Sequence, residues 1–192
     1  MGKGLEHDNE AAERRIVSML AAGDGSALDE LYALYAPRIY RYTYRMLNNA
    51  ADAEDATQET FYRVMRKSRD LRADAAFRTW IFRIARNLCI DRIRQQPLVD
   101  LPMDATVGAP EEQTALHIAV RQALNELPQE YREPLILCDV EEITANEAAE
   151  ILDLSVPALK SRLYRGRRAL KERLGPAVEE LPREKHRHPK SD

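Results

Sequence analysis

Residues 144–173 read TANEAAEILDLSVPALKSRLYRGRRALKER, and this stretch decides the fold of the C-terminal half. Thr144 and Glu147 fit a capping box, in which a hydroxyl and a glutamate three residues later cap the start of a helix. Residues 153–155 then form a tight turn, and Ser155 is placed to cap a second helix. We therefore predict a helix-turn-helix at about residues 144–173.

The second of these helices is predicted to have two faces. Leu159, Leu163 and Leu170 fall on an apolar stripe, whereas the arginines and Ser161 fall on the other side. A basic face opposite an apolar stripe suits a helix that enters the major groove of DNA. The alternative is an amphipathic helix whose basic face is only solvated. The capped short helix and the tight turn before it favour DNA binding, without indicating which class of regulator this is.

Charge is arranged in blocks outward from this motif, although the whole chain has a net charge of only −3. Residues 160–173 hold seven basic residues and one acidic residue. Residues 63–94 hold ten basic residues and three acidic ones, whereas residues 125–150 hold eight acidic residues and one arginine. Two basic blocks separated by an acidic block indicate surfaces that serve different partners.

Between the two halves, residues 97–110 contain three prolines, one glycine and no basic residue. We interpret this stretch as a flexible linker, because a residue before proline disfavours helix; an ordered surface loop is the alternative. The sequence thus predicts an all-α chain of two small helical domains joined by a linker, with the helix-turn-helix in the C-terminal domain. The predicted boundaries are a polar N-terminal segment at 1–23, a first domain at 24–96, the linker at 97–112, a second domain at 113–175 and a disordered tail at 176–192.

Several classes of function are disfavoured by composition. No stretch approaches the roughly 18 apolar residues of a membrane span, and the polar N-terminus lacks the apolar core of a signal peptide, so we expect a cytoplasmic protein without membrane insertion. Cys89 and Cys138 are expected to be buried free thiols. No phosphate-binding loop, HExxH motif or nucleophile with a histidine partner occurs, so we expect no enzyme activity, cofactor or metal.

Two further motifs lie in the N-terminal half. Residues 52–61 read DAEDATQETF, which places carboxylates in the first turn of a helix, where the helix dipole favours them. Residues 77–87 read FRTWIFRIARN and are followed by Asp91 and Arg92. With the helix-turn-helix, these motifs in this order resemble the extracytoplasmic-function (ECF) group of bacterial sigma factors. The resemblance covers roughly residues 24–95 and 113–174 and implies a factor that binds core RNA polymerase and directs promoter-specific transcription initiation.

The resemblance also implies which residues form each surface. It assigns core-polymerase binding to Asp52, Glu54, Asp55, Gln58 and Glu59. It assigns recognition of the melted −10 promoter element to Arg66, Arg72, Phe77, Arg78, Trp80, Arg83, Asn87 and Arg92. It assigns recognition of the −35 element to Ser155, Pro157, Ala158, Lys160, Ser161, Arg162, Arg165 and Arg168. The implied partners are core RNA polymerase, promoter DNA and a sequestering anti-sigma factor, with a monomer when the protein is free.

Residue chemistry supports parts of this assignment and leaves alternatives open. Asn87 has an amide that can hydrogen-bond a flipped base, and arginines can follow the phosphates of a single strand. Trp80 is also compatible with an ordinary core position. Pro157, Ala158 and Lys160 stand where many relatives have glycine, threonine and arginine, which bears on −35 preference. Two other classes remain: an ordinary repressor or activator, and a sigma mimic that sequesters an anti-sigma factor.

Overall fold

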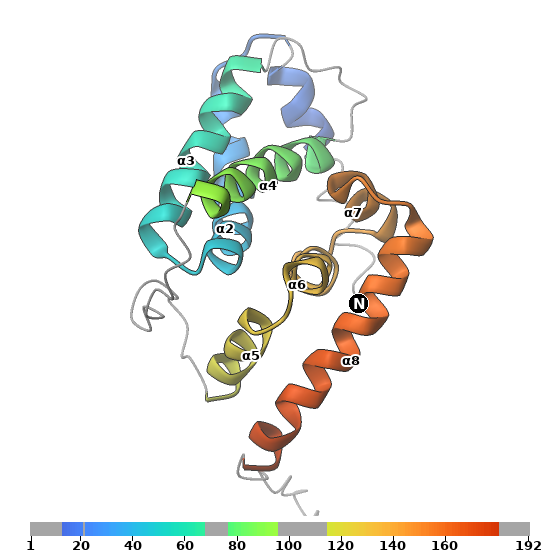
Figure 1. Ribbon diagram of the computed structural model, residues 1–192. Helices are drawn as coiled ribbons and strands as arrows, with labels where there is room; N and C mark the ends of the chain where they lie inside the picture. The colour runs from blue at the N-terminus through green and yellow to red at the C-terminus, as the bar shows by residue number, and fades with distance from the viewer. Residues whose placement is uncertain (1–12, 21, 68–76, 96–114, 181–192) are drawn as a thin grey trace, which may run out of the picture.

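The computed structural model describes residues 13–20, 22–67, 77–95 and 115–180, with side chains up to residue 175. Within these ranges every regular element is a helix, which confirms the predicted all-α class (Figure 1). None of the described helices combines the length and the apolarity that a bilayer span requires.

The N-terminal domain is built from α2 (Ser26–Leu47), α3 (Ala50–Lys67) and α4 (Phe77–Gln95), which pack against one another. Residues 13–20 form a further helix before them, and its Ile16, Val17 and Leu20 are buried in the core. The segment predicted as polar over residues 1–23 therefore contributes apolar side chains to the fold.

A proline such as Pro37 would ordinarily begin or break a helix. Pro37 instead lies inside one continuous helix and is exposed. A proline removes only one backbone hydrogen bond, and here Tyr35 and Ile39 on either side of it are fully buried, so their packing outweighs that loss. The helix ends at Asn48, as expected from its sequence, in a left-handed conformation with φ of 52° and its N–H bonded to the Tyr44 carbonyl.

The C-terminal domain contains α5 (Ala115–Asn125), α6 (Gln129–Leu135), the π-helical turn η2 (Ile136–Val140), α7 (Ala145–Leu152) and α8 (Val156–Glu180). Pro134 lies inside the second of these helices, because α6 begins five residues earlier and runs through it. Immediately afterwards the backbone widens into η2. Helix α8 runs through residues 176–180, so that part of the predicted tail is helical, and residues 181–192 lie outside the described part.

The predicted helix-turn-helix is present. The Glu147 N–H donates to the Thr144 hydroxyl and the Thr144 N–H donates to the Glu147 carboxylate, which completes the capping box before α7. Asp153 ends α7 in a left-handed conformation, and Ser155 accepts a hydrogen bond from the Ala158 N–H at the start of α8. Gly166 lies where α8 crosses α6: a β-carbon there would be 3.2 Å from the Tyr131 carbonyl oxygen.

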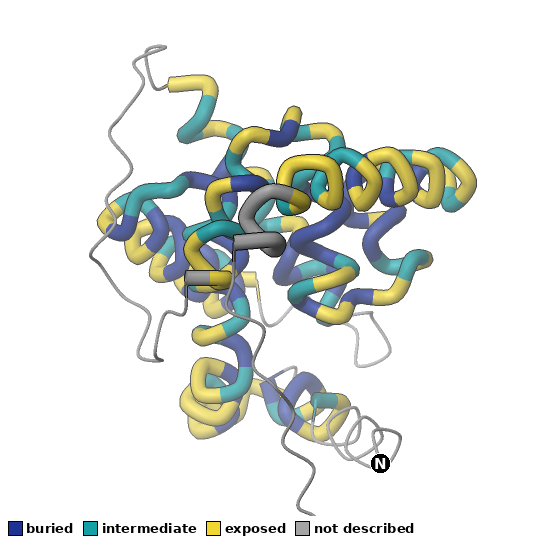
Figure 2. Tube along the Cα trace, turned by 90° about the horizontal axis from the view of Figure 1, so that it is seen from below, coloured by how far each residue is buried: buried dark blue, intermediate teal, exposed yellow. Residues whose placement is uncertain are grey.

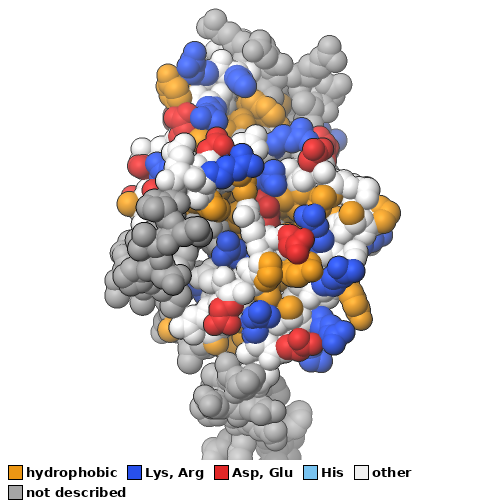
Figure 3. Space-filling view, in the orientation of Figure 1, with side chains coloured by type: hydrophobic (Ala, Val, Ile, Leu, Met, Phe, Trp, Pro, Cys, Tyr) orange, Lys and Arg blue, Asp and Glu red, His pale blue; other side chains and the backbone are white. Residues whose placement is uncertain are grey.

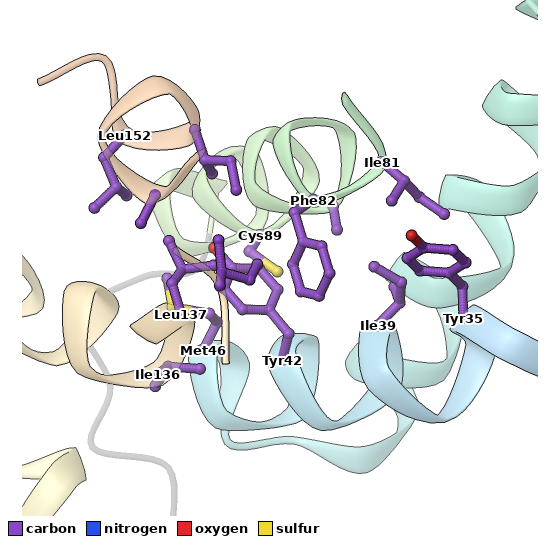
Figure 4. Close-up of a cluster of buried hydrophobic side chains, with 14 of the residues drawn as sticks. Tyr35, Ile39, Tyr42, Met46, Ile81, Phe82, Cys89, Ile136, Leu137 and Leu152 are labelled. Carbon is purple, nitrogen blue, oxygen red and sulfur yellow. The ribbon is translucent and has the colours of Figure 1, made fainter. Parts of the chain in front are cut away.

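The two domains pack against each other. Helix α4 contacts α7, and α2 contacts η2. Figure 4 shows Tyr42, Phe82 and Cys89 of the first domain beside Leu137 and Leu152 of the second. Buried positions concentrate where the helices face one another, whereas the outer turns are exposed (Figure 2). The predicted linker lies outside the described residues. The described residues show that the two domains share one apolar core.

Candidate nucleic-acid interface

Helix α8 presents the residues expected to read the −35 element on the outside of the C-terminal domain. Basic side chains, with a few acidic ones between them, lie over α8 at the lower right of Figure 3. The structure places these positions together along the first four turns: Pro157, Lys160, Ser161, Arg165 and Arg168 are exposed, and Ala158 and Arg162 are half-buried. Ser155 is exposed, and its hydroxyl caps the helix by accepting a hydrogen bond from the Ala158 N–H.

One aromatic residue of this surface was not predicted. Tyr164 is 70% exposed, the largest value among the large hydrophobic side chains described as exposed, and it lies between Leu163 and Arg165. The apolar periodicity of α8 already excludes Tyr164 from the core stripe, so its outward position was available from the sequence. Arg167 has a different role, because its guanidinium donates to Asp139 at 3.0 and 2.6 Å and braces α8 against η2.

Helix α4 gives a mixed result for the expected −10 residues. Asn87 is exposed, as a base-binding amide requires. Phe77 is 1% exposed and its ring lies 5.4 Å from that of Tyr35, so its side chain packs in the core in this conformation, and its contact with DNA stays a prediction. Trp80 is half-buried with its ring 5.7 Å from that of Phe77, in agreement with its alternative reading as a core residue.

Two arginines expected to hold −10 DNA are bonded instead to α7. Arg78 donates to the Glu147 carboxylate at 2.8 Å, and Arg83 donates to the backbone carbonyl of Glu150 at 2.6 Å. The pKa of Arg78 is raised, because Glu147 favours its charged form even though burial opposes it as the largest single influence. Glu147 thus caps α7 and binds α4 at once. In the sequence, the acidic block at residues 125–150 was the one sign of this pairing.

One buried polar contact between the domains is centred on Glu133. Its carboxylate accepts hydrogen bonds from the Tyr42 hydroxyl at 3.0 Å and from Arg86 at 2.7 Å, and the whole residue is 4% exposed. Burial, followed by the neighbouring Glu133, raises the pKa of Tyr42 well above its usual value. The same two causes raise the pKa of Cys89 to about 12. A buried carboxylate with two donors stabilises the closed arrangement only while both donors stay in place.

A second buried carboxylate, Glu141, holds α2. The Glu141 side chain has no exposed surface, and Arg41 donates to its two oxygens at 3.2 and 3.0 Å. Arg38 lies 3.7 Å from the same carboxylate and also donates to the Glu141 backbone carbonyl. These residues were not singled out from the sequence, because each pair lies at least 100 residues apart in the chain.

The residues expected to bind polymerase lie together on α3. Glu54, Asp55 and Gln58 are exposed, and Asp52 and Glu59 are half-buried. A surface pocket is lined by Asp55, Gln58, Glu59, Tyr62 and Arg92. Tyr62 is 49% exposed, and its ring lies under the Arg66 guanidinium at 5.8 Å from the centroid. Arg66 is exposed, and Arg72 lies outside the described residues.

Arg92 faces α3, although it was expected to contact −10 DNA. Its guanidinium donates to the Asp52 carboxylate at 2.8 Å and to the Asp55 carboxylate at 3.0 Å. In the described part of the chain, no group of three or more His, Cys, Asp and Glu side chains is arranged to hold a metal ion.

The chain matches two protein-family models and is similar to known sigma factors. Residues 31–97 match the model of sigma-70 region 2, and residues 117–170 match that of sigma-70 region 4. The chain is 32% identical over 180 residues to the ECF RNA polymerase sigma factor SigW of Bacillus subtilis, covering 84% of this chain and 96% of that protein. It is 36% identical over 168 residues to the ECF RNA polymerase sigma factor SigE of Mycolicibacterium smegmatis, covering 80% of this chain and 65% of that protein.

Solved structures show the same fold. The chain matches CnrH, solved in complex with the cytosolic domain of CnrY, with a TM-score of 0.71 and 25% identity over 86% of this chain and 98% of that one. It also matches the sigma factor RpoE of Bartonella quintana, solved with the anti-sigma factor NepR, with a TM-score of 0.68 and 24% identity over 77% of this chain and 96% of that one.

Proposed function

The chain belongs to the ECF group of the sigma-70 family and is a sigma factor that directs promoter-specific transcription initiation by RNA polymerase, and from this premise we propose how its surfaces divide the work. Helix α3 binds core polymerase, α4 captures the melted −10 strand, and α8 reads the −35 duplex. The observation that carries this division is that an acidic helix face and two arginine-rich faces lie on three different helices.

For α3, the proposal is supported by the exposure of its acidic face. Carboxylates in an otherwise basic domain would attract a basic surface of the polymerase and orient the encounter. Asp55, Gln58 and Glu59 also line one pocket, so they present a continuous polar surface to a partner. Tyr62 at the pocket rim adds an exposed ring, which is a common anchor in protein interfaces.

For α8, the proposal is supported by a basic face that is exposed while the domains are closed. Lys160 and Arg165 lie close enough to the helix start to reach base edges when that end points into the major groove. Arg168 is positioned for the phosphate backbone, although in this structure it is bonded to Glu172 at 2.9 Å. Binding by this face is expected to weaken as salt rises, because each neutralised phosphate releases counterions.

For α4, the proposal requires that the C-terminal domain move away from the −10 surface. Arg78 and Arg83 are bonded to α7 in the closed arrangement, so a DNA strand must displace those bonds to use them. Asn87 is exposed already and would contact a base without that movement. We propose that binding to polymerase separates the domains before −10 capture.

The partners follow from the same proposal. The structural relatives above were solved with CnrY and with the anti-sigma factor NepR, and we propose that an anti-sigma factor likewise sequesters this protein in the closed form. The free protein is proposed to be a cytoplasmic monomer that acts by binding rather than by catalysis.

Run-off transcription with purified core polymerase on a promoter library tests the function. We expect initiation at a defined subset of promoters that share −35 and −10 sequences, and only when this chain is added. A matched variant, Asp55→Lys with Glu59→Lys, reverses charge on α3 and should abolish that initiation while the free protein still binds −35 duplex. Transcription that does not depend on the chain at any promoter would refute the proposal.

A further inference from the structure

A guanidinium from the −10 helix is bonded into the acidic helix. Arg92, in the last turn of α4, donates through Nη1 to both the backbone carbonyl and the carboxylate of Asp52, each at 2.8 Å. Its Nη2 donates to the Asp55 carboxylate at 3.0 Å. One planar fork therefore joins three acceptors on α3, a geometry that arginine provides and lysine does not.

The three acceptors lie on the side of α3 that is proposed to bind polymerase. Asp52 and Asp55 are three residues apart, so they occupy the same helix face. Arg92 also lines the surface pocket with Asp55, Gln58 and Glu59. The Asp55 side chain is 64% exposed despite its bond to Arg92, so the carboxylate can still meet a partner.

We propose that Arg92 is a positioning residue for polymerase binding: it fixes the carboxylates of Asp52 and Asp55 and ties α3 to α4 as one rigid unit. This inference rests on the proposed docking role of α3. It replaces the expected contact between Arg92 and −10 DNA, because a guanidinium that bridges two carboxylates is a weak partner for phosphate.

The physical effect of Arg92 is preorganisation. Without a cation between them, the clustered carboxylates of α3 repel one another and sample several rotamers, and binding must then order them. With the arginine in place, that ordering is complete before polymerase arrives. Since the bridge joins α3 to α4, it also keeps the polymerase-binding face in a fixed orientation relative to Asn87.

A core-binding titration with the full-length chain tests the role of Arg92. Arg92→Ala should weaken core affinity about fivefold, the range expected for a partly exposed ion-pair network. Arg92→Lys keeps the charge but cannot bridge, so its affinity should fall between those of the wild type and Arg92→Ala. The matched control is Arg94→Ala, which removes the same charge from an exposed position in the same turn and should change affinity by about twofold at most.

A double-mutant cycle separates positioning from other roles. In a chain that carries Asp52→Asn and Asp55→Asn, the change Arg92→Ala should cause a much smaller loss than in the wild type, because both carboxylates are already neutral and only the Asp52 backbone carbonyl keeps its bond to Arg92. Additive losses, or tighter core binding by Arg92→Ala, would overturn the positioning role. So would unchanged core affinity with a loss of −10 single-strand binding, which would restore the DNA contact.

The same cycle shows whether the premise fails instead. If the Asp52→Asn, Asp55→Asn chain binds core polymerase as tightly as wild type, the docking role of α3 is wrong, whatever Arg92 does. If it binds weakly and Arg92→Ala alone has no effect, only the inference about Arg92 is wrong. Thermal unfolding of each variant excludes loss of fold, and Arg92→Lys replaces Arg92→Ala in the cycle if the alanine variant unfolds.

Discussion

The arginine face of α4 and the basic face of α8 look alike in sequence but differ in the folded chain. On α4, Arg78 and Arg86 are paired with carboxylates of the C-terminal domain. On α8, Lys160 and Arg165 are exposed. A basic block in the sequence therefore identifies a possible DNA surface without showing whether another part of the chain occupies it. Here the acidic block at residues 125–150 supplies the occupant from within the chain.

The largest expected effect comes from breaking the buried contact on the α4 side. Arg86→Ala leaves the Glu133 carboxylate with only the Tyr42 hydroxyl, and an uncompensated buried charge costs about 3 kcal/mol in the free energy of unfolding. Urea unfolding of the free protein measures this cost. Adding Glu133→Gln to Arg86→Ala should recover part of it, because the amide carries no charge. Equal stability of Arg86→Ala and wild type would show that the domains do not stay closed in solution.

Cys89 provides a measurement of burial in the apolar core. Burial raises the pKa of this thiol to about 12, whereas a thiol in an unfolded chain ionises near about 8.5. Alkylation of Cys89 at pH 8 should therefore be at least about a hundredfold slower in the folded protein than in urea. Because the folded pKa is raised, stability should fall as pH rises above about 8.5, where only the unfolded thiol ionises. Equal alkylation rates in both states would contradict this burial.

On the α8 side, removal of one arginine should act on DNA binding alone. Arg165→Ala should cost about 1–3 kcal/mol in binding to its −35 duplex if the guanidinium contacts a base, and the preference at one position should relax. Titration of the full chain at several salt concentrations measures both. If Arg165 contacts only phosphate, the loss should be uniform across sequences and the salt slope should shrink by about one unit. Wild-type affinity and slope for the Lys160→Ala, Arg165→Ala chain would exclude α8 as the reader.

The smallest expected effect is the release of Arg78. Glu147→Gln keeps a capping amide at the start of α7 but removes the charge that holds Arg78, so −10 single-strand binding by the free protein should improve about threefold. Glu150→Gln is the matched control, because Arg83 contacts only the backbone carbonyl of that residue. Fluorescence anisotropy with a −10 oligonucleotide measures both variants, and similar affinities for the two would mean that the Glu147 charge does not compete with DNA.

A feature could be predicted from the sequence where it depends on neighbouring residues. It could not be predicted where it depends on contacts between residues far apart in the chain. The capping box at Thr144 and the turn before α8 are set by neighbouring residues, so they were predicted correctly. The continuity of α2 through Pro37 depends on packing that only the folded chain supplies. Phe77 could have been assigned to the core, because it begins the buried stripe that continues at Ile81 and Ala85.

For the candidate site, the sequence did not show which group each arginine would bind. The predicted DNA contacts included Arg78, Arg83 and Arg92, because of their residue type and their position in the motif. Each lies near a carboxylate or carbonyl that is at least 37 residues away in the chain. The bonds of Arg78 and Arg83 depend on the closed arrangement of the two domains, and those of Arg92 depend on how α4 packs on α3. No local pattern encodes either. Arg165 and Asn87 had no such long-range partner to divert them in the described structure, and both are exposed as expected.

Gly166 lies at the crossing of α6 and α8, and the long helix α8 can tilt about this point. Helix α8 has 25 residues, and Gly166 lies ten residues after its first residue, about 15 Å along the axis. A β-carbon at 3.2 Å from the Tyr131 carbonyl would push the two helices apart by a few tenths of an ångström at this pivot. The resulting tilt would move the reading end of α8 sideways relative to the rest of its domain. The direction of the end of α8 that is proposed to read DNA therefore depends on the absence of a β-carbon at Gly166.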